Sequence, residues 1–174
     1  IIGEIIEEEV GERALSVAKI AASHPTIVNG LKKPETTNEI QDIALKLQKS
    51  VGAEYVVIGD EHEIRYAHPY PDRIGKKMVG DDNYRALING EAYISEAKGT
   101  LGRALRGKAP VFDENGTIIG VVSVGFLYTD IFSSNINYSK YLGIIFIVAI
   151  VLSIFLASYF SNKIKALLMN HEPQ

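Results

Sequence analysis

The C-terminal part of the chain contains an uninterrupted apolar run from Tyr141 to Phe160. The run holds no charge, proline, asparagine or glutamine, and a tyrosine lies at or near each end. About 20 apolar residues in a helix cross the roughly 30 Å core of a bilayer, and tyrosine rings favour its interfaces. A buried helix of a soluble protein rarely stays apolar on every face for such a length. The run therefore predicts one transmembrane helix.

Lysines on either side of this run predict its orientation in a cell membrane. Lys163 and Lys165 follow the run, and Lys140 precedes it. The positive-inside rule places the short C-terminal tail in the cytoplasm and the larger N-terminal part outside the cell or in the periplasm. The chain then divides into an extracytoplasmic domain (1–135), a transmembrane helix with its juxtamembrane lead-in (136–162) and a cytoplasmic tail (163–174).

Composition and motifs exclude several classes of function for this sequence. The part before the run has about 135 residues, enough for one domain with its own core. The formal net charge is -3 and there is no cysteine, so neither a nucleic-acid-binding surface nor a thiol nucleophile is expected. The sequence has no P-loop and no H-E-x-x-H spacing. We therefore expect no catalytic residue, metal or cofactor in this chain, and no enzymatic activity.

Hydrophobic periodicity predicts helices first and strands afterwards. Apolar residues at three- and four-residue steps indicate a helix over 5–22 and a second helix that ends at Gly52. Thr36 and Glu39 have the spacing of a capping box at the start of the second helix. This order of elements is typical of an α+β domain with an antiparallel sheet of about five strands. The expected strands are 55–58, 64–67, 92–97, 102–112 and 117–127, with a short helix over 81–89 and a turn over 113–116.

Four potentially cationic side chains occur in two close pairs. Arg65 and His68 lie where a strand gives way to a loop. Arg106 and Lys108 lie two residues apart on a later strand, so their side chains share one face of the sheet. Gly107 between them removes bulk from the opposite face. Such donors suit a small polyanion, because arginine binds carboxylate with two parallel hydrogen bonds.

Two hydroxyl residues, Thr100 and Ser123, lie in the same half of the chain and add further donors. Ser123 lies within an apolar strand pattern and not at a strand-to-helix elbow, so we do not expect it to be a nucleophile. An alternative interpretation is that the cations are ordinary surface charges on an exposed sheet face.

These residues fall within motifs that resemble a known family. Their order is similar to that in the extracytoplasmic sensor domain of CitA-type citrate-sensing histidine kinases, a family that includes DcuS-type sensors of C4-dicarboxylates. The resemblance rests on R-Y-A-H-P-Y-P-D-R-I-G (65–75), M-V-G-D-D-N (78–83), K-G-T-L-G (98–102), L-R-G-K-A-P (105–110) and I-G-V-V-S-V-G (119–125).

The resemblance implies a PAS-like (PDC/Cache-related) domain between two transmembrane helices of a dimeric two-component sensor. The kinase domains that would reach a response regulator are absent from this sequence. Small residues at every fourth position from Ala149 to Ser161 predict a helix–helix contact in the membrane. The family signals by a piston-like shift of the membrane helix. The implied ligand is citrate, alone or as a metal complex, held by Arg65, His68, Arg106 and Lys108, the hydroxyls of Thr100 and Ser123, and the backbone of Gly99 and Leu101.

Two positions favour citrate over C4-dicarboxylates within this family. DcuS-type sensors typically have an aromatic residue in place of Lys108 and a bulky residue in place of Thr100. A tricarboxylate needs the additional cation and the additional room. Val57 replaces a hydroxyl that the family can place on the preceding strand. Three alternatives remain: a C4-dicarboxylate sensor, a chemoreceptor-type ligand-binding domain, and a membrane-tethered enzyme or binding protein.

Overall fold

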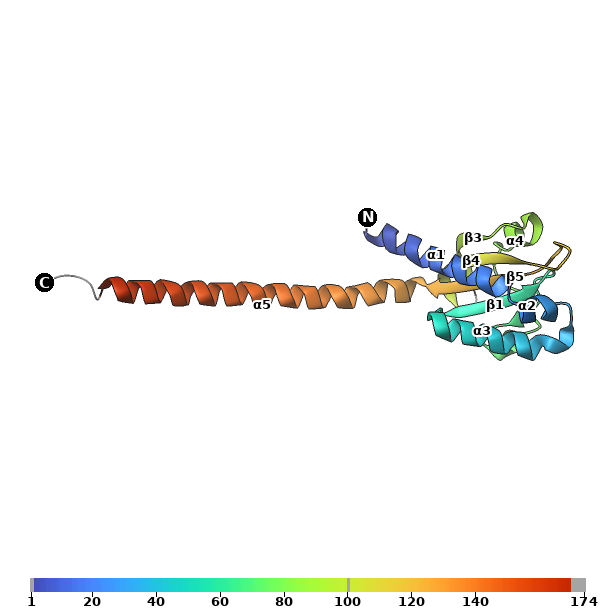
Figure 1. Ribbon diagram of the computed structural model, residues 1–174, viewed down its shortest axis with the longest axis horizontal. Coiled ribbons are helices and arrows are strands. Elements are labelled where there is room, and N and C mark those ends of the chain that lie inside the picture. The colour runs from blue at the N-terminus through green and yellow to red at the C-terminus, as the bar shows by residue number, and fades with distance from the viewer. Residues whose placement is uncertain (1, 100, 170–174) are drawn as a thin grey trace. The chain divides into compact units, whose positions relative to one another are not determined.

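The computed structural model describes residues 2–99 and 101–169 of the chain (Figure 1). It divides into two units, of which the first ends at Ile131 and the second begins at Phe132. The first unit is an α+β domain with a five-stranded sheet, as the order of sequence patterns predicted. Its elements are α1 (Ile2–Ala22), α2 (Pro25–Gly30), the 3-10 helix η1 (Pro34–Thr36), α3 (Thr37–Val51), β1 (Tyr55–Asp60), β2 (Arg65–Ala67), the 3-10 helix η2 (Pro71–Arg73), α4 (Tyr84–Asn89), β3 (Tyr93–Gly99), β4 (Gly102–Phe112) and β5 (Ile118–Leu127).

Local signals in the sequence set the ends of the first helices. Pro25 occupies the first turn of α2, where its missing N–H leaves no hydrogen bond unmade. The side chain of His24 accepts a hydrogen bond from the backbone N–H of Thr26 (3.2 Å) and so caps the same helix. Gly52 ends α3 in the left-handed conformation, with φ of 66°, and donates its N–H to the carbonyl of Gln48. Glycine is therefore favoured at the C-terminal end of α3, because it adopts a positive φ without steric strain.

The predicted capping box at the start of α3 is wrong. Thr36 occupies the N-cap position, but its side chain makes no capping hydrogen bond. Its φ of -91° and ψ of 8° differ from the extended conformation that directs an N-cap oxygen toward the first-turn N–H groups. The hydroxyl instead lies 2.7 Å from the carbonyl oxygens of Gly30 and Lys33. It therefore stabilises the turn between α2 and α3.

The sheet is antiparallel throughout, with the strand order β2-β1-β5-β4-β3. The two central long strands, β4 and β5, form a hairpin whose turn the sequence predicted. Asp113 closes it, because its Oδ1 accepts hydrogen bonds from the N–H groups of Asn115 and Thr117, both at 2.9 Å. Gly116 supplies the positive φ of 79° that this turn requires.

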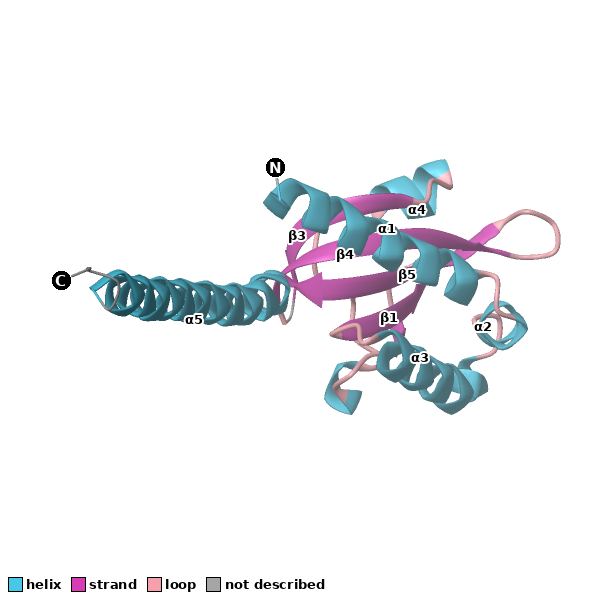
Figure 2. Cartoon of the chain, turned by 60° about the vertical axis from the view of Figure 1, so that its left-hand side comes forward, coloured by secondary structure: helices cyan, strands magenta, loops and turns pink. Residues whose placement is uncertain are grey.

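Helices α1 and α3 lie across one face of this sheet, which holds the main hydrophobic core (Figure 2). Side chains on a strand alternate between the two faces, so every second residue of the central strands points toward these helices. The positions on this face are small or β-branched, which lets the helices pack closely. Buried core residues on this side include Ala14, Ala18, Ala21, Ile40, Ala44, Val56, Ile58, Ala109, Val111, Val122 and Val124.

The helix α5 (Tyr128–Met169) follows β5 without an intervening loop. Its segment Lys140–Lys165 has a mean hydropathy of 2.7, and none of its most apolar part is buried. In the described residues this is one helix that is long and apolar enough to cross a membrane. Length and composition therefore support a single membrane-spanning segment, as the apolar run predicted.

Candidate ligand-binding site

The register of the strands places Arg106 and Lys108 next to each other on the face opposite α1 and α3. Lys108 pairs with Ser123 of β5, and Ser123 pairs with Val57 of β1. Arg106 lies one row further along and pairs with Gly125, which has no side chain. The common face that the two-residue spacing predicted is therefore present. Val57 occupies the position next to Ser123 and offers no hydroxyl there.

Gly107 lies between the two cations and faces α1. A Cβ added to Gly107 would lie 2.1 Å from the backbone nitrogen of Leu15 and 2.2 Å from the backbone carbon of Ala14. The helix backbone therefore runs directly against β4 at this point. This contact fixes the strand from behind and directs its two charged neighbours to the other face.

His68 follows β2 and is held by contacts with both its backbone and its ring. The side chain of Gln41 on α3 accepts a hydrogen bond from the His68 N–H (2.9 Å) and donates one to its carbonyl (2.8 Å). The N–H of Tyr70 donates to Nδ1 of the imidazole at 3.0 Å. Because Nδ1 is an acceptor, the proton of the neutral ring is assigned to Nε2. His68 can then donate one hydrogen bond from Nε2.

The predicted cations meet at a cavity with about 350 Å³ of empty space, part of it open to solvent. The exposed fractions of Arg65, Arg106 and Lys108 are 4%, 3% and 1%. The interpretation of these side chains as ordinary surface charges is therefore wrong. Thr100 lies outside the described residues, and Gly99 is the last residue of β3. The predicted site residues that line the cavity are Arg65, His68, Leu101, Arg106, Lys108 and Ser123.

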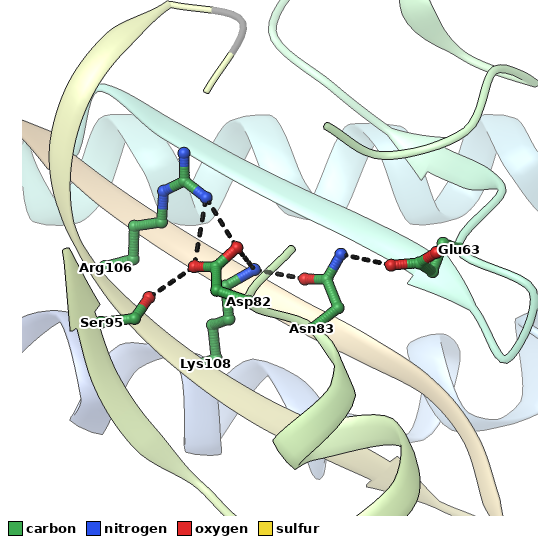
Figure 3. A network of polar contacts seen from close by, with 6 residues as sticks. All are labelled: Glu63, Asp82, Asn83, Ser95, Arg106 and Lys108. Atoms are coloured by element: carbon green, nitrogen blue, oxygen red, sulfur yellow. Dashed lines mark hydrogen bonds and ion pairs between the residues drawn. The ribbon is translucent and has the colours of Figure 1, made fainter. Parts of the chain in front are cut away.

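The two cations of β4 contact a carboxylate that the sequence analysis did not assign to the site (Figure 3). Arg106 Nη1 lies 3.1 Å and 3.2 Å from the two carboxylate oxygens of Asp82. Lys108 Nζ lies 3.3 Å from Oδ1 of the same carboxylate. The hydroxyl of Ser95 on β3 donates to the other oxygen, Oδ2, at 2.6 Å. Asp82 therefore has a partner at each of its oxygens.

Asn83 extends this network. Its amide oxygen accepts a hydrogen bond from Lys108, and its amide nitrogen donates to Glu63 at 2.8 Å (Figure 3). Asn83 is 1% exposed, so these contacts satisfy a side chain that water does not reach. Both Asp82 and Asn83 belong to the motif M-V-G-D-D-N, which contributed to the family resemblance without a role for either residue. That motif was the signal that could have identified them.

Residues 4–137 match the family model for single Cache domain 3. This match covers more than half of the chain. The chain belongs to that family.

Curated relatives and a solved structure agree with this assignment. The Cache domain protein is 53% identical over 126 residues to the sensor protein CitS of Halalkalibacterium halodurans, covering 72% of this chain and 23% of CitS. It is 36% identical over 171 residues to the sensor histidine kinase CitA of Klebsiella pneumoniae, covering 98% of this chain and 31% of CitA. The crystal structure of the Escherichia coli DcuS sensor domain superposes with a TM-score of 0.70 at 36% identity, covering 76% of this chain and 98% of that domain. This chain spans less than a third of the length of either curated relative.

A tyrosine also enters the site of this Cache domain from β1. Tyr55 pairs with Gly125 in the register, and a Cβ at Gly125 would lie 2.1 Å from Tyr55 Cζ. The ring therefore lies over the glycine and lines the same cavity as Arg106 and Ser123. Burial raises the pKa of the Tyr55 phenol, although Arg106 acts in the opposite direction. Tyr55 thus stays a neutral hydrogen-bonding group beside the cations.

Burial and charge have opposing effects on the ionisation of the site. Burial lowers the pKa of Lys108 to about 8, even though the charge of Asp82 acts to raise it. Burial alone raises the pKa of Asp82, but Lys108, the Ser95 hydroxyl and Arg106 outweigh it and hold that pKa below its ordinary value. Burial and the charge of Arg65 both lower the pKa of His68. At pH 7 the site therefore contains three cations, one carboxylate and a neutral imidazole.

Proposed function

We propose that this Cache domain is the extracytoplasmic sensor of a two-component histidine kinase and that its ligand is citrate. The observation that carries the proposal is the convergence of the buried residues Arg65, His68, Arg106 and Lys108 at one cavity. Desolvating several like charges together is costly unless an anion compensates them. A small molecule with several carboxylates provides that compensation.

The geometry supports a division of the ligand between two groups of donors. Arg106, Lys108 and Ser123 lie on neighbouring strands of the sheet, whereas Arg65 and His68 come from β2 and the residue after it. One carboxylate would bind the first group and another the second. The backbone of Gly99 and Leu101 and the hydroxyl of Thr100 would add hydrogen bonds. Calorimetry with and without magnesium ions would show whether the ligand is citrate alone or its metal complex.

A sensor of C4-dicarboxylates is the second candidate, and one contact favours it. Asp82 offsets part of the positive charge that Arg106 and Lys108 present. The positive charge that remains at the cavity also suits a dianion. Lys108 favours citrate instead, because it places an additional point charge at the cavity that a third carboxylate can use.

Signal transmission is proposed to run through the strand that carries Ser123. This strand, β5, is followed directly by α5, which contains the candidate membrane span. A ligand that draws the strand toward the cavity would shift the helix along its axis, provided that it binds the shifted state more tightly. We also propose that the sensor domain lies outside the membrane and that the protein is a homodimer. The full-length protein would then act on a response regulator.

Titration calorimetry of the whole chain in lipid nanodiscs tests the proposal. We expect citrate to bind more tightly than isocitrate, tricarballylate, malate or succinate. Arg106→Ala should weaken citrate binding by about a hundredfold or more, since it removes a buried charged partner. The control is Arg103→Ala on the same strand, because Arg103 is 70% exposed and pairs with Glu96. Equal citrate affinity of the parent and Arg106→Ala would disprove the site, and stronger succinate binding would favour the second candidate.

A further inference from the structure

The cations that the ligand is proposed to bind already contact a carboxylate of the protein itself. Asp82 Oδ1 lies 3.1 Å from Arg106 Nη1 and 3.3 Å from Lys108 Nζ (Figure 3). These are the distances at which a ligand carboxylate would bind the same two groups. The side chain of Asp82 is 18% exposed, whereas those of Arg106 and Lys108 are 3% and 1% exposed. The carboxylate thus lies at the solvent side of the cation pair.

The backbone before Asp82 is shaped to hold it there. Gly80 has a φ of 117°, a conformation that side-chain-bearing residues rarely adopt. A Cβ at Gly80 would lie 2.7 Å from Asp82 Oδ1 and 3.1 Å from Arg106 Nη1. The glycine therefore lets the chain pass directly over the ion pair. Together with the Ser95 hydroxyl at 2.6 Å, it gives Asp82 a defined position.

Arg106 keeps a donor that is not used within the protein. Its Nε is buried and has no hydrogen-bond partner among residues 2–99 and 101–169. A buried guanidinium nitrogen without a partner is costly. The pairing with Asp82 thus satisfies only part of this side chain and leaves it able to bind a second acceptor.

We propose that Asp82 is an affinity- and specificity-determining residue that competes with a ligand carboxylate for Arg106 and Lys108. This inference rests on the proposed function, because it assigns the competing ligand to the carboxylate class. Two carboxylates that share one cation pair repel each other, so the ligand must displace Asp82 or bind against its charge. A trianion is opposed more strongly than a dianion. Asp82 therefore limits the affinity for citrate more than the affinity for succinate.

The test is a calorimetric comparison of the parent chain with Asp82→Asn in nanodiscs. Asparagine keeps the size of the side chain and removes its charge. We expect the Kd for citrate to fall about tenfold and the Kd for succinate to fall less than about threefold. The matched control is Asp81→Asn, which removes the same charge from the adjacent, exposed residue and should leave both values unchanged. Ser95→Ala, which loosens Asp82 without removing it, should change citrate affinity in the same direction and by less.

The possible outcomes distinguish a failure of the competition by Asp82 from a failure of the proposed function on which it rests. If the parent binds citrate and Asp82→Asn binds it equally or more weakly, Asp82 only positions Arg106 and the competition is disproved. An equal gain with Asp81→Asn would assign the effect to overall charge and would also disprove it. If neither chain binds any of the carboxylates, the proposed function fails and the inference fails with it. Thermal unfolding checks that Asp82→Asn folds, and Ser95→Ala decides the matter if it does not.

Discussion

The two faces of the sheet differ in what they bury. The face under α1 and α3 is apolar, with small and β-branched side chains packed against helix backbones. The opposite face buries Arg65, Arg106 and Lys108 around a cavity. Both faces are formed by the same strands, since alternate residues of β4 and β5 point to opposite sides.

The helix face is stabilised by apolar packing alone, whereas the cavity face combines small apolar clusters with buried charges. Each fully buried valine or isoleucine on the helix side contributes about 1.5–3 kcal/mol to the free energy of unfolding. Each buried charge on the cavity side costs desolvation free energy that its partners only partly recover. The domain can hold a cluster of cations because apolar packing, which is most extensive on the helix face, supplies the stability. Substitutions on the helix face should therefore mainly change the free energy of unfolding, and those on the cavity face should mainly change ligand affinity.

The largest effect is expected on the helix face, at Gly107. Its added Cβ would meet backbone atoms of Ala14 and Leu15 at 2.1–2.4 Å. Backbone in the middle of a packed helix has no alternative position, so strand and helix must separate. Gly107→Ala should lower the free energy of unfolding by about 3 kcal/mol or more. Thermal and urea unfolding measure this change.

The matched substitution on the cavity face is Gly125→Ala, one strand away. Its Cβ would meet the ring of Tyr55 and not a backbone atom. The ring can be pushed toward Arg106, so we expect a smaller loss of stability and a clear loss of citrate affinity. Similar unfolding curves for Gly107→Ala and Gly125→Ala would contradict the distinction between the two faces.

The next effect concerns ligand charge, at Lys108 on the cavity face. Lys108→Met should raise the Kd for citrate about thirtyfold and the Kd for malate only a few-fold, because the additional charge serves a third carboxylate. The pKa of Lys108 is lowered to about 8 by burial. A bound anion raises this pKa, so binding takes up a proton when Lys108 is neutral, and citrate affinity should fall as pH rises above about 8.

Calorimetry from pH 7 to 9 tests both parts of this expectation. The control is Lys98→Met, which removes an exposed lysine of β3. Loss of affinity by the same factor for citrate and malate would remove Lys108 as the discriminating residue. A decline above pH 8 that persists in Lys108→Met would assign the titration to another group.

The α+β order of elements followed from local patterns, the full set of donors was implied by the family resemblance, and the acceptor Asp82 was not predicted. Two-residue spacing on a strand sufficed to place Arg106 and Lys108 on one face. The lack of a side chain at Gly107 likewise predicted reduced bulk on the other face. These are properties of a single strand and need no knowledge of the partner segments.

Asp82 and Thr36 show why the remaining contacts could not be predicted from the sequence. Asp82 contacts residues 24 and 26 positions further along the chain, so only the folded sheet brings it to Arg106 and Lys108. The motif M-V-G-D-D-N indicates this stretch of the chain, but the sequence does not distinguish Asp82 from the adjacent Asp81. Thr36 has the spacing of a capping box, but its hydroxyl contacts the preceding turn. Local motifs predict which bonds a residue can form, and tertiary contacts decide among them.

The smallest effect is expected at His68, at the edge of the cation cluster. Burial and the charge of Arg65 lower its pKa below the ordinary 6.5, so the imidazole is neutral at pH 7. A bound anion favours the imidazolium and raises that pKa. Ligand binding therefore takes up a proton at pH values between the pKa of His68 in the free domain and its pKa in the bound domain. Citrate affinity should therefore fall a few-fold as pH rises through the range around and below 6.5. His68→Gln keeps a donor without a titration, and the protonation of citrate itself is common to both chains. Parallel pH profiles for parent and His68→Gln would show that His68 keeps one protonation state and acts only through its Nε2 hydrogen bond.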